Sequence, residues 1–167
     1  MGNGSAAVAL LQLINPIERT QDPARVGSYR GEPYVVAADV SSSPLRTGVS
    51  GWTWYTGSAG WMYRIWIEDI LGFHLRGNQL FLRPEIPVDW PSCEMSFWYH
   101  SSLYQIAMVR LSGSNTCRVE CDGRLAEQGI VNLVDDGAKH SIQVEIGTID
   151  GPRDARSLPD PKVRSVS

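Results

Sequence analysis

Aromatic, hydroxyl and glycine residues are concentrated in one stretch, Gly51–Arg64, which reads GWTWYTGSAGWMYR. It holds three tryptophans and two tyrosines around the pair Thr56-Gly57. A Thr-Gly turn that opens a helix offers a hydroxyl and unpaired backbone N–H groups, which are the donors that a phosphate accepts from. Aromatic side chains are large apolar planes, which suit the flat faces of a sugar ring. The stretch therefore indicates phosphate and carbohydrate chemistry.

The composition and charge of the chain exclude several classes of function. A chain of 167 residues is expected to form one domain, or one domain with an appendage. A net charge of −3 and the absence of a Lys/Arg run argue against nucleic acid or an anionic membrane as the main partner. No apolar run approaches the roughly 20 residues that span a bilayer. The N-terminal apolar run, Ala6–Leu11, lacks the basic residues of a signal peptide, so we expect a soluble cytoplasmic protein.

Metal and disulfide chemistry is also not expected. The chain has three cysteines, an odd number that fits buried thiols in a reducing compartment better than a disulfide framework. Cys117 and Cys121 lie in a strand-like stretch with no His or Cys pair nearby, so they do not predict a zinc site. The histidines are His74, His100 and His140. Their spacing provides no partners for a metal site or a catalytic triad, and we predict neither a metal nor a cofactor.

The first half of the chain has the pattern of helices and loops. Ser5–Ile14 predicts a short capped helix, and Ser58–Leu71 predicts a second, longer one. Both are apolar almost all round, so we expect Trp61 and Trp66 to lie in a core. Tyr34–Val40 could be a strand or a buried helix, because periodicity does not decide between them at this length.

The second half has the pattern of strands. Five stretches rich in aromatic and β-branched residues are expected as strands. They are Gln79–Arg83, Glu94–His100, Leu103–Leu111, Cys117–Cys121 and Ser141–Ile146. Ser101-Ser102 fits a two-residue hairpin turn, and Asp135-Asp136-Gly137 is a turn sequence. Short strands with hairpin signals predict a small antiparallel sandwich or jelly roll.

Helices followed by strands predict an α+β fold, or two domains that meet near Gly72–Gly77. We expect residues 1–76 to form helices and loops, residues 77–149 a β-sandwich, and residues 150–167, rich in Pro, Arg, Asp and Ser, a disordered tail. The two apolar helices cannot cover each other completely, and a sheet can cover only one side. Either the chain oligomerises or it is the end of a larger helical domain, and we favour the second interpretation.

Several longer motifs occur in a characteristic order. They are Asn15-Pro16-Ile17, Pro33–Val40, Gly51–Arg64, Ile70-Leu71-Gly72 and Val134–Gly137. Together they resemble the C-terminal end of glycoside hydrolase family 94, which includes cellobiose and chitobiose phosphorylases. The family also includes the phosphorylase-like end of cyclic β-1,2-glucan synthases, to which the likeness is greatest. The resemblance covers roughly Ser5–Ile146.

This resemblance implies a fold and a reaction. The fold is the last part of an (α/α)6 barrel, in residues 1–76, followed by a C-terminal β-sandwich or jelly roll. The reaction is the inverting, reversible phosphorolysis of a β-glucoside, in which inorganic phosphate is the co-substrate and no cofactor takes part. Phosphate replaces water as the nucleophile, and a carboxylic acid protonates the leaving oxygen.

In the family this general acid is an Asp well upstream of the matched motifs. We therefore expect a fragment of a glycosyltransferase that is inactive alone, with a separate chain as one source for the rest of the barrel. The alternative is a non-catalytic carbohydrate-binding or interaction module. The fragment interpretation predicts uncovered apolar faces on Ala6–Ile14 and Trp61–Leu71.

Three residues are candidates for a phosphate site. Thr56 and Gly57 match the Thr-Gly pair that contacts phosphate in the family, although Thr56 could instead be only the cap of its helix. Arg19 stands where the family usually has a phosphate-binding His after its Asn-Pro-Ile-x motif. An Arg can bind phosphate in a bidentate manner, so Arg19 is either a substitute ligand or a sign that the site has decayed.

Three more residues are candidates for contacts with the sugar. Glu32 precedes Pro33-Tyr34, where the family tends to have an acidic residue near its sugar site. It could accept hydrogen bonds from sugar hydroxyls, or it could be a loop cap or a salt-bridge partner. Trp54 and Tyr55 could form a stacking surface for a sugar, or they could pack between the barrel and the sandwich.

Overall fold

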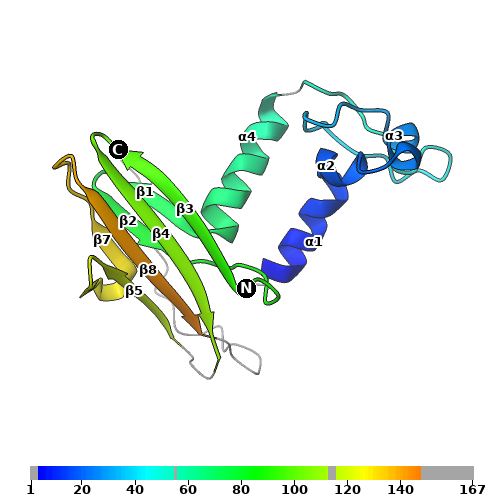
Figure 1. The fold of residues 1–167 in the computed structure, drawn as a ribbon. Helices are drawn as coiled ribbons and strands as arrows, with labels where there is room; N and C mark the ends of the chain where they lie inside the picture. The colour runs from blue at the N-terminus through cyan, green and yellow to red at the C-terminus, as the bar shows by residue number, and fades with distance from the viewer. Residues whose placement is uncertain (1–3, 55, 113–115, 148–167) are drawn as a thin grey trace, which may run out of the picture.

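The computed structural model of the chain describes residues 4–54, 56–112 and 116–147. Helices occupy one side of the molecule and strands the other, as Figure 1 shows. The predicted α+β class is therefore confirmed. Tyr55 and the predicted tail 150–167 lie outside the described residues.

Both helices predicted from the sequence are present. They are α1, Gly4–Ile14, and α4, Thr56–Arg64, which continues without a break as a π-helix, η1, over Ile65–Ile70. The second helix thus begins two residues earlier than predicted. Its last turn widens, because Leu71 N–H donates to Trp66 O (2.9 Å), the i→i+5 bond of a π-helix.

Two short helices between them were not predicted. They are α2, Pro16–Arg19, and α3, Pro23–Tyr29. Each begins with a proline that directly follows a capping residue. The side chain of Asn15 accepts from Ile17 N–H at 3.1 Å, and that of Asp22 accepts from Arg25 N–H at 2.9 Å. Asn15-Pro16 follows directly on α1 and starts the next helix.

The prediction of a strand or a buried helix over Tyr34–Val40 was wrong in both forms. The segment is a loop whose polar backbone groups pair with the returning chain. Ala38 N–H donates to Trp52 O (2.7 Å), and Val40 forms an isolated antiparallel bridge with Ser50. These bonds replace those of a regular element and hold residues 34–40 against residues 50–52.

The strands form two sheets. One has the order β1-β2-β7 and the other β3-β4-β8-β5-β6. The strands are β1 Phe73–Arg76, β2 Gln79–Leu82, β3 Ser92–Tyr99, β4 Ser102–Leu111, β5 Cys117–Cys121, β6 Arg124–Leu125, β7 Ile130–Asn132 and β8 Lys139–Gly147, with a 3₁₀ turn, η2, at Glu127–Gly129. All pairs of strands are antiparallel except β4 and β8, which are parallel.

All five predicted strands are confirmed, with small shifts at their ends. The hairpin between β3 and β4 turns at His100-Ser101 rather than at Ser101-Ser102, because Tyr99 pairs with Ser102. His100 takes the positive φ of 52° that this turn needs. The strands β1, β6 and β7 were missed, since each is only two to four residues long.

Both sheets contribute to one apolar core. Leu80 and Leu82 of β2 and Val131 of β7 face it from one sheet, and Met108 and Ile142 face it from the other. The helices join the same core through three buried side chains. These are Val8, Leu11 and Ile70. The helical and strand parts of the chain are therefore packed together.

A sharp change of direction joins the helical part to the strands. Gly72 follows η1 with a φ of 65°, and its carbonyl accepts from Arg83 N–H (2.9 Å). A Cβ atom at Gly72 would lie 2.1 Å from the carbonyl carbon of Arg83, so only glycine fits this junction. Nearby, Trp66 of η1 stacks on Trp90, with nearly parallel rings whose centroids are 6.4 Å apart.

Large apolar side chains remain exposed on the helical part. Leu10 and Leu13 of α1 are 66% and 54% exposed, and Trp61 and Tyr63 of α4 are 66% and 67% exposed. The expectation that Trp61 lies in a core was thus wrong, whereas Trp66 is partly buried against it. None of the described helices is long and apolar enough to cross a membrane.

Candidate functional site

The chain entering the Thr-Gly turn is held in place by backbone bonds. Gly51 N–H donates to Asp39 O (2.8 Å), next to the pairing of Ala38 with Trp52. A Cβ atom at Gly51 would lie 1.8 Å from a carboxylate oxygen of Asp39, so a larger residue at this position would have to displace the Asp39 side chain. Backbone hydrogen bonds to residues 38–40 therefore fix the position of residues 50–52, which precede α4.

Glu32 and Trp54, two of the predicted sugar-site residues, are in direct contact. The indole Nε1–H of Trp54 donates to Glu32 Oε1 at 3.1 Å, across 22 positions of sequence. Tyr34 meets the same indole edge to face, with ring centroids 6.2 Å apart. Trp54 takes a positive φ of 62°, which directs the chain into α4. Both aromatic side chains remain largely exposed.

Hydrogen-bond donors keep the Glu32 carboxyl ionised. Its pKa is lowered chiefly by its own backbone N–H, then by the side chain of Thr53 and by the indole of Trp54, against the opposing effect of burial. An ionised carboxylate is purely a hydrogen-bond acceptor. The Oε1 of Glu32 is bonded to the indole, whereas its Oε2 is buried without a hydrogen-bond partner in the described structure, so the role of Glu32 in binding a sugar stays a prediction.

The Thr-Gly pair lies at the start of α4. Thr56 is its first residue and Gly57, which is exposed, its second. The first turn of α4 has no acidic residue, so its unpaired N–H groups face no competing carboxylate from that turn. The side chain of Thr56 and the whole of Tyr55 are outside the described atoms. Their contacts with phosphate and sugar therefore stay predictions.

Arg19 lines a cavity of about 340 Å³ in the helical part of the molecule. It is the last residue of α2, and its Nε–H donates to Leu13 O (2.6 Å) at the end of α1. Arg25 also lines the cavity, but it is bound to Asp22, Glu18 O and Gln21. The complete lining is Gln12, Leu13, Glu18, Arg19, Arg25, Ser28, Tyr29 and Gly48.

Tyr29 gives this cavity an unusual polar group. Its side chain is 1% exposed, yet its hydroxyl has no hydrogen-bond partner within the described structure. Burial raises the pKa of the phenol, and the positive charge of Arg19 opposes this rise. An unpaired buried hydroxyl costs free energy unless a ligand or water satisfies it. Arg19, Ser28 and Tyr29 together offer the charge and the donors that an anion needs, with Glu18 as the opposing charge.

The predicted site residues lie in two places, the cavity and the surface around Glu32 and Trp54, and a backbone hydrogen bond connects the two. Arg19 and Tyr29 line the cavity, whereas Glu32, Trp54 and Gly57 do not. Tyr29 O accepts from Ser50 N–H (2.7 Å), so the chain leading to Glu32 is fixed to the segment that leads to the Thr-Gly pair. Sequence reasoning missed Ser28 and Tyr29. The Asp22-Pro23 capping pair was the signal for α3, the helix that carries them.

These observations describe a class of protein: an α+β chain whose helical part combines a Thr-Gly helix start, a cavity lined by Arg19 and Arg25, and an aromatic pair beside a carboxylate. Comparison with known proteins finds a family that matches the helical part of the chain. Residues 1–72 match the family described as "Glycosyl hydrolase 94 superfamily, catalytic domain". Over this segment the chain is similar to the glycosyl hydrolase 94 family, and the resemblance that its motifs indicate is confirmed.

The similar curated proteins are glucan synthases and phosphorylases. The chain is 41% identical over 103 residues to "Cyclic beta-(1,2)-glucan synthase NdvB" of Rhizobium meliloti (strain 1021), an alignment that covers 62% of this chain and 4% of that protein. It is 31% identical over 104 residues to "Solabiose phosphorylase" of Paenibacillus borealis, covering 60% and 13%. It is 28% identical over 67 residues to "Cellobionic acid phosphorylase" of Neurospora crassa, covering 40% and 8%. The chain thus spans a small part of the length of each relative.

Proposed function

We propose that this chain forms one wall of a phosphate and β-glucoside site of a glycoside phosphorylase or glucan synthase. In this proposal residues 1–76 are the last helices and loops of an (α/α)6 barrel, and residues 77–149 are the β-sandwich that follows it. The observation that carries the proposal is the match of residues 1–72 to the catalytic domain of the family. A cytoplasmic location is part of the proposal.

The phosphate half of the wall consists of Arg19, Gly57 and Thr56. A guanidinium pairs with two phosphate oxygens at once, and a helix start adds backbone N–H groups. The cavity beside Arg19, with the unpartnered hydroxyl of Tyr29, supports the interpretation of Arg19 as a substitute ligand for the family's His rather than a sign of decay. No metal or cofactor is needed for this chemistry, because inorganic phosphate is itself the nucleophile.

The sugar half of the wall consists of Glu32, Trp54 and Tyr55. The Glu32 carboxylate, already bonded to the indole of Trp54, supports a role as acceptor for sugar hydroxyls. The exposed apolar faces of α1 and α4 support a surface that further barrel helices, in the same protein or in a separate chain, would cover. In this proposal the chain is inactive alone, because the family's general acid comes from upstream of the segment that is matched here.

Titration with inorganic phosphate tests the phosphate half. In ¹⁵N-labelled protein we expect the backbone amide of Gly57 and the guanidinium of Arg19 to shift, with sodium chloride at equal ionic strength as the control. Arg19→Gln is expected to abolish the shifts, and Arg124→Gln, on the exposed strand β6, to retain them. Phosphate titration without any shift at these two residues would refute the proposed site.

An activity assay tests the proposed inactivity. The purified chain is incubated with phosphate and β-linked glucose disaccharides, and released glucose 1-phosphate is measured. We expect none above background, since no residue of this chain is proposed as the general acid. Release by the chain alone, dependent on Arg19, would contradict that part of the proposal and would require an acid within these residues.

The alternative function, a carbohydrate-binding module without catalysis, is favoured by one observation. Tyr34 and Trp54 form an exposed aromatic pair beside a carboxylate. Binding of β-glucans with unchanged affinity in Arg19→Gln, together with loss in Trp54→Ala, would select the module. Binding that depends on phosphate and on Arg19 would select the phosphorylase wall.

A further inference from the structure

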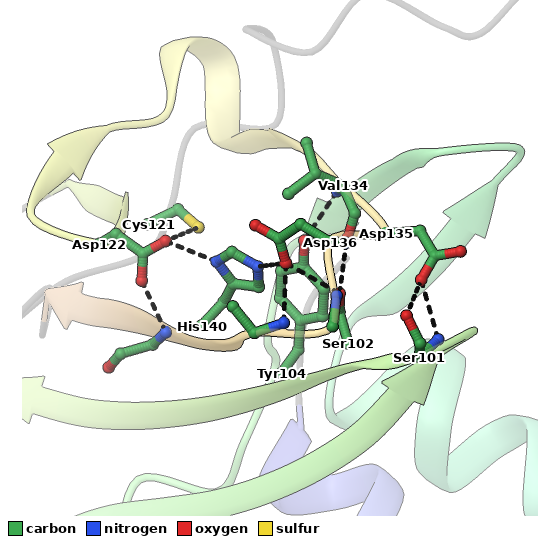
Figure 2. Close-up of polar contacts among 12 residues, drawn as sticks. Ser101, Ser102, Tyr104, Cys121, Asp122, Val134, Asp135, Asp136 and His140 are labelled. Atoms are coloured by element: carbon green, nitrogen blue, oxygen red, sulfur yellow. Dashed lines mark hydrogen bonds and ion pairs between the residues drawn. The ribbon is translucent and has the colours of Figure 1, made fainter.

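A polar cluster lies at the end of the five-stranded sheet where β8 begins (Figure 2). At its centre is His140, the second residue of β8, whose side chain is 11% exposed. Its Nδ1 lies 2.8 Å from Asp122 Oδ2, and its Nε2 lies 3.1 Å from Asp136 Oδ1. Each nitrogen of one imidazole ring therefore faces its own carboxylate.

Both carboxylates are fixed by bonds that do not involve the ring. Asp122, in the turn between β5 and β6, accepts from Ser141 N–H (2.9 Å) through Oδ1. Asp136, in the loop between β7 and β8, accepts from Ala138 N–H (2.9 Å) and from the Ser102 hydroxyl (3.1 Å). Their positions are therefore set by the backbone, and His140 is inserted between two acceptors that are already in place.

The protonation state of the ring follows from this geometry. A neutral imidazole carries one N–H, so its other nitrogen would direct a lone pair at a carboxylate oxygen. An imidazolium donates from both nitrogens, and its charge strengthens both bonds. Tyr104 adds to this preference: its ring stacks on His140 with centroids 4.6 Å apart and planes 22° apart, and the face of an aromatic ring attracts a cation.

The two carboxylates belong to two different connections, one that joins the two sheets and one that is a hairpin turn within the five-stranded sheet. The Asp136 loop leads from β7, in the three-stranded sheet, to β8, in the five-stranded sheet. The Asp122 turn lies on the hairpin β5–β6, from which the chain returns to the three-stranded sheet. The imidazole of His140 thus contacts both the β5–β6 turn and the β7–β8 loop.

We propose that His140 is a proton-dependent clamp, an imidazolium that bridges the β5–β6 turn and the β7–β8 loop with two charge-assisted hydrogen bonds and loses one of these bonds when the ring loses its proton. This inference does not depend on the proposed phosphorylase wall, because none of its residues belongs to that site.

The titratable groups around the ring leave His140 as the group that switches near neutral pH. Hydrogen bonding to Asp122 is the largest effect that raises the pKa of His140. The pKa values of Asp122 and Asp136 are lowered, chiefly by the backbone N–H groups of Ser141 and Ala138. Burial raises the pKa of the Cys121 thiol to about 11, so it stays protonated.

The remaining neighbours do not change this conclusion. Burial raises the pKa of the Tyr104 phenol, whose hydroxyl is already bonded to the backbone of Val134. Asp135, next to Asp136, is bonded to Ser101, and these bonds lower the pKa of its carboxyl. Both groups therefore keep one protonation state across the range in which His140 titrates.

The sign of the pH dependence follows from these directions. Because the pKa of His140 is raised in the folded chain, its stabilisation is complete below the ordinary His value of 6.5 and is lost as the pH rises through the raised value. The contribution of the two aspartates is complete above the ordinary Asp value of 3.8 and is lost as the pH falls through their lowered values. The clamp is therefore strongest between these two ordinary values.

An NMR titration of the full chain tests the clamp directly. The ring nitrogens of His140 are followed from pH 5 to pH 9, with His74 as the internal comparison. We expect both nitrogens of His140 to be protonated at pH 6, with a midpoint above 6.5 that Asp136→Asn lowers. A midpoint at or below 6.5, or a neutral single tautomer at pH 6, would overturn the proposal.

Denaturation supplies a second, independent readout. Urea midpoints of the wild type are expected to fall between pH 6 and pH 9, and this fall should vanish in His140→Gln while persisting in the matched variant His74→Gln. An equal pH dependence in His140→Gln and the wild type would refute the clamp. If His140→Gln does not fold, the NMR midpoint of the wild type decides alone.

Discussion

Replacing Gly72 by alanine should be among the most damaging single changes in the chain. Gly72 lies where η1 ends and β1 begins, with a φ of 65°. A Cβ atom there would lie 2.1 Å from both the carbonyl carbon and oxygen of Arg83 and 2.5 Å from the nitrogen of Pro84. These are backbone atoms of a neighbouring segment, so no side-chain rotation can relieve the overlap.

The cost in free energy of unfolding can be estimated from three parts. A left-handed backbone costs an alanine about 1–2 kcal/mol relative to glycine. Moving the junction apart would also weaken two bonds, Arg83 N–H to Gly72 O and Glu85 N–H to Ile70 O, both 2.9 Å long, at about 1 kcal/mol each. With disturbed packing of buried Ile70 at about 1 kcal/mol or more, the total is about 4–6 kcal/mol. That is a large share of the 5–15 kcal/mol by which domains are typically stable.

Gly77 provides the matched control. It also has a left-handed backbone, with a φ of 61°, but a Cβ atom there would meet nothing within 4 Å. Gly77→Ala should therefore cost only the backbone part, about 1–2 kcal/mol. Urea unfolding followed by far-UV circular dichroism gives both values. A difference of less than about 1 kcal/mol between the variants would refute the reasoning, whereas a folded Gly77→Ala beside an unfolded Gly72→Ala would agree with it.

Three further changes test other parts of the fold. Tyr104→Phe removes the hydroxyl that accepts from Val134 N–H (2.8 Å) and donates to Val134 O (3.1 Å), so urea unfolding should show a loss of about 1–3 kcal/mol. Ile142→Ala, at a fully buried position, should cost about 2–5 kcal/mol, and a loss below about 1 kcal/mol would contradict its place in the core. Asp22→Ala removes the cap of α3, so the amide of Arg25 should exchange faster with solvent, and unchanged exchange would contradict the capping bond.

The sequence predicts the elements with strong periodicity. The helix starting near Thr56 and the long strands β3, β4 and β8 have many residues of one pattern, so small errors at their ends do not hide them. Short elements such as β7 contain too few residues for a repeating pattern to be recognised. The wrong prediction at Tyr34–Val40 has another cause. Its apolar residues suggested a regular element, but the hydrogen bonds of its last three residues go to a segment ten or more positions away. The local sequence pattern carries no information about hydrogen-bond partners that are so far away in the sequence.

The candidate site was predictable only in part. Motif order led to Arg19, Glu32 and Trp54, and the bond between the last two is a long-range contact consistent with a shared site. The cavity around Tyr29 could not be predicted, because it arises from the way α1, α2 and α3 turn against each other. His140 was dismissed for want of partners at a characteristic spacing. Its partners are 4 and 18 positions away and meet it only through the sheet.

The place of β8 has a consequence for how the chain folds during its synthesis. This strand is the last described one in the sequence, yet it lies in the middle of the five-stranded sheet, parallel to β4 and antiparallel to β5. While the ribosome makes the chain, the hairpins β3–β4 and β5–β6 therefore emerge with open edges that only β8 can join. A pause before β8 would leave both edges open to pairing with other nascent chains. Completion of the sheet is thus tied to translation of residues 139–147.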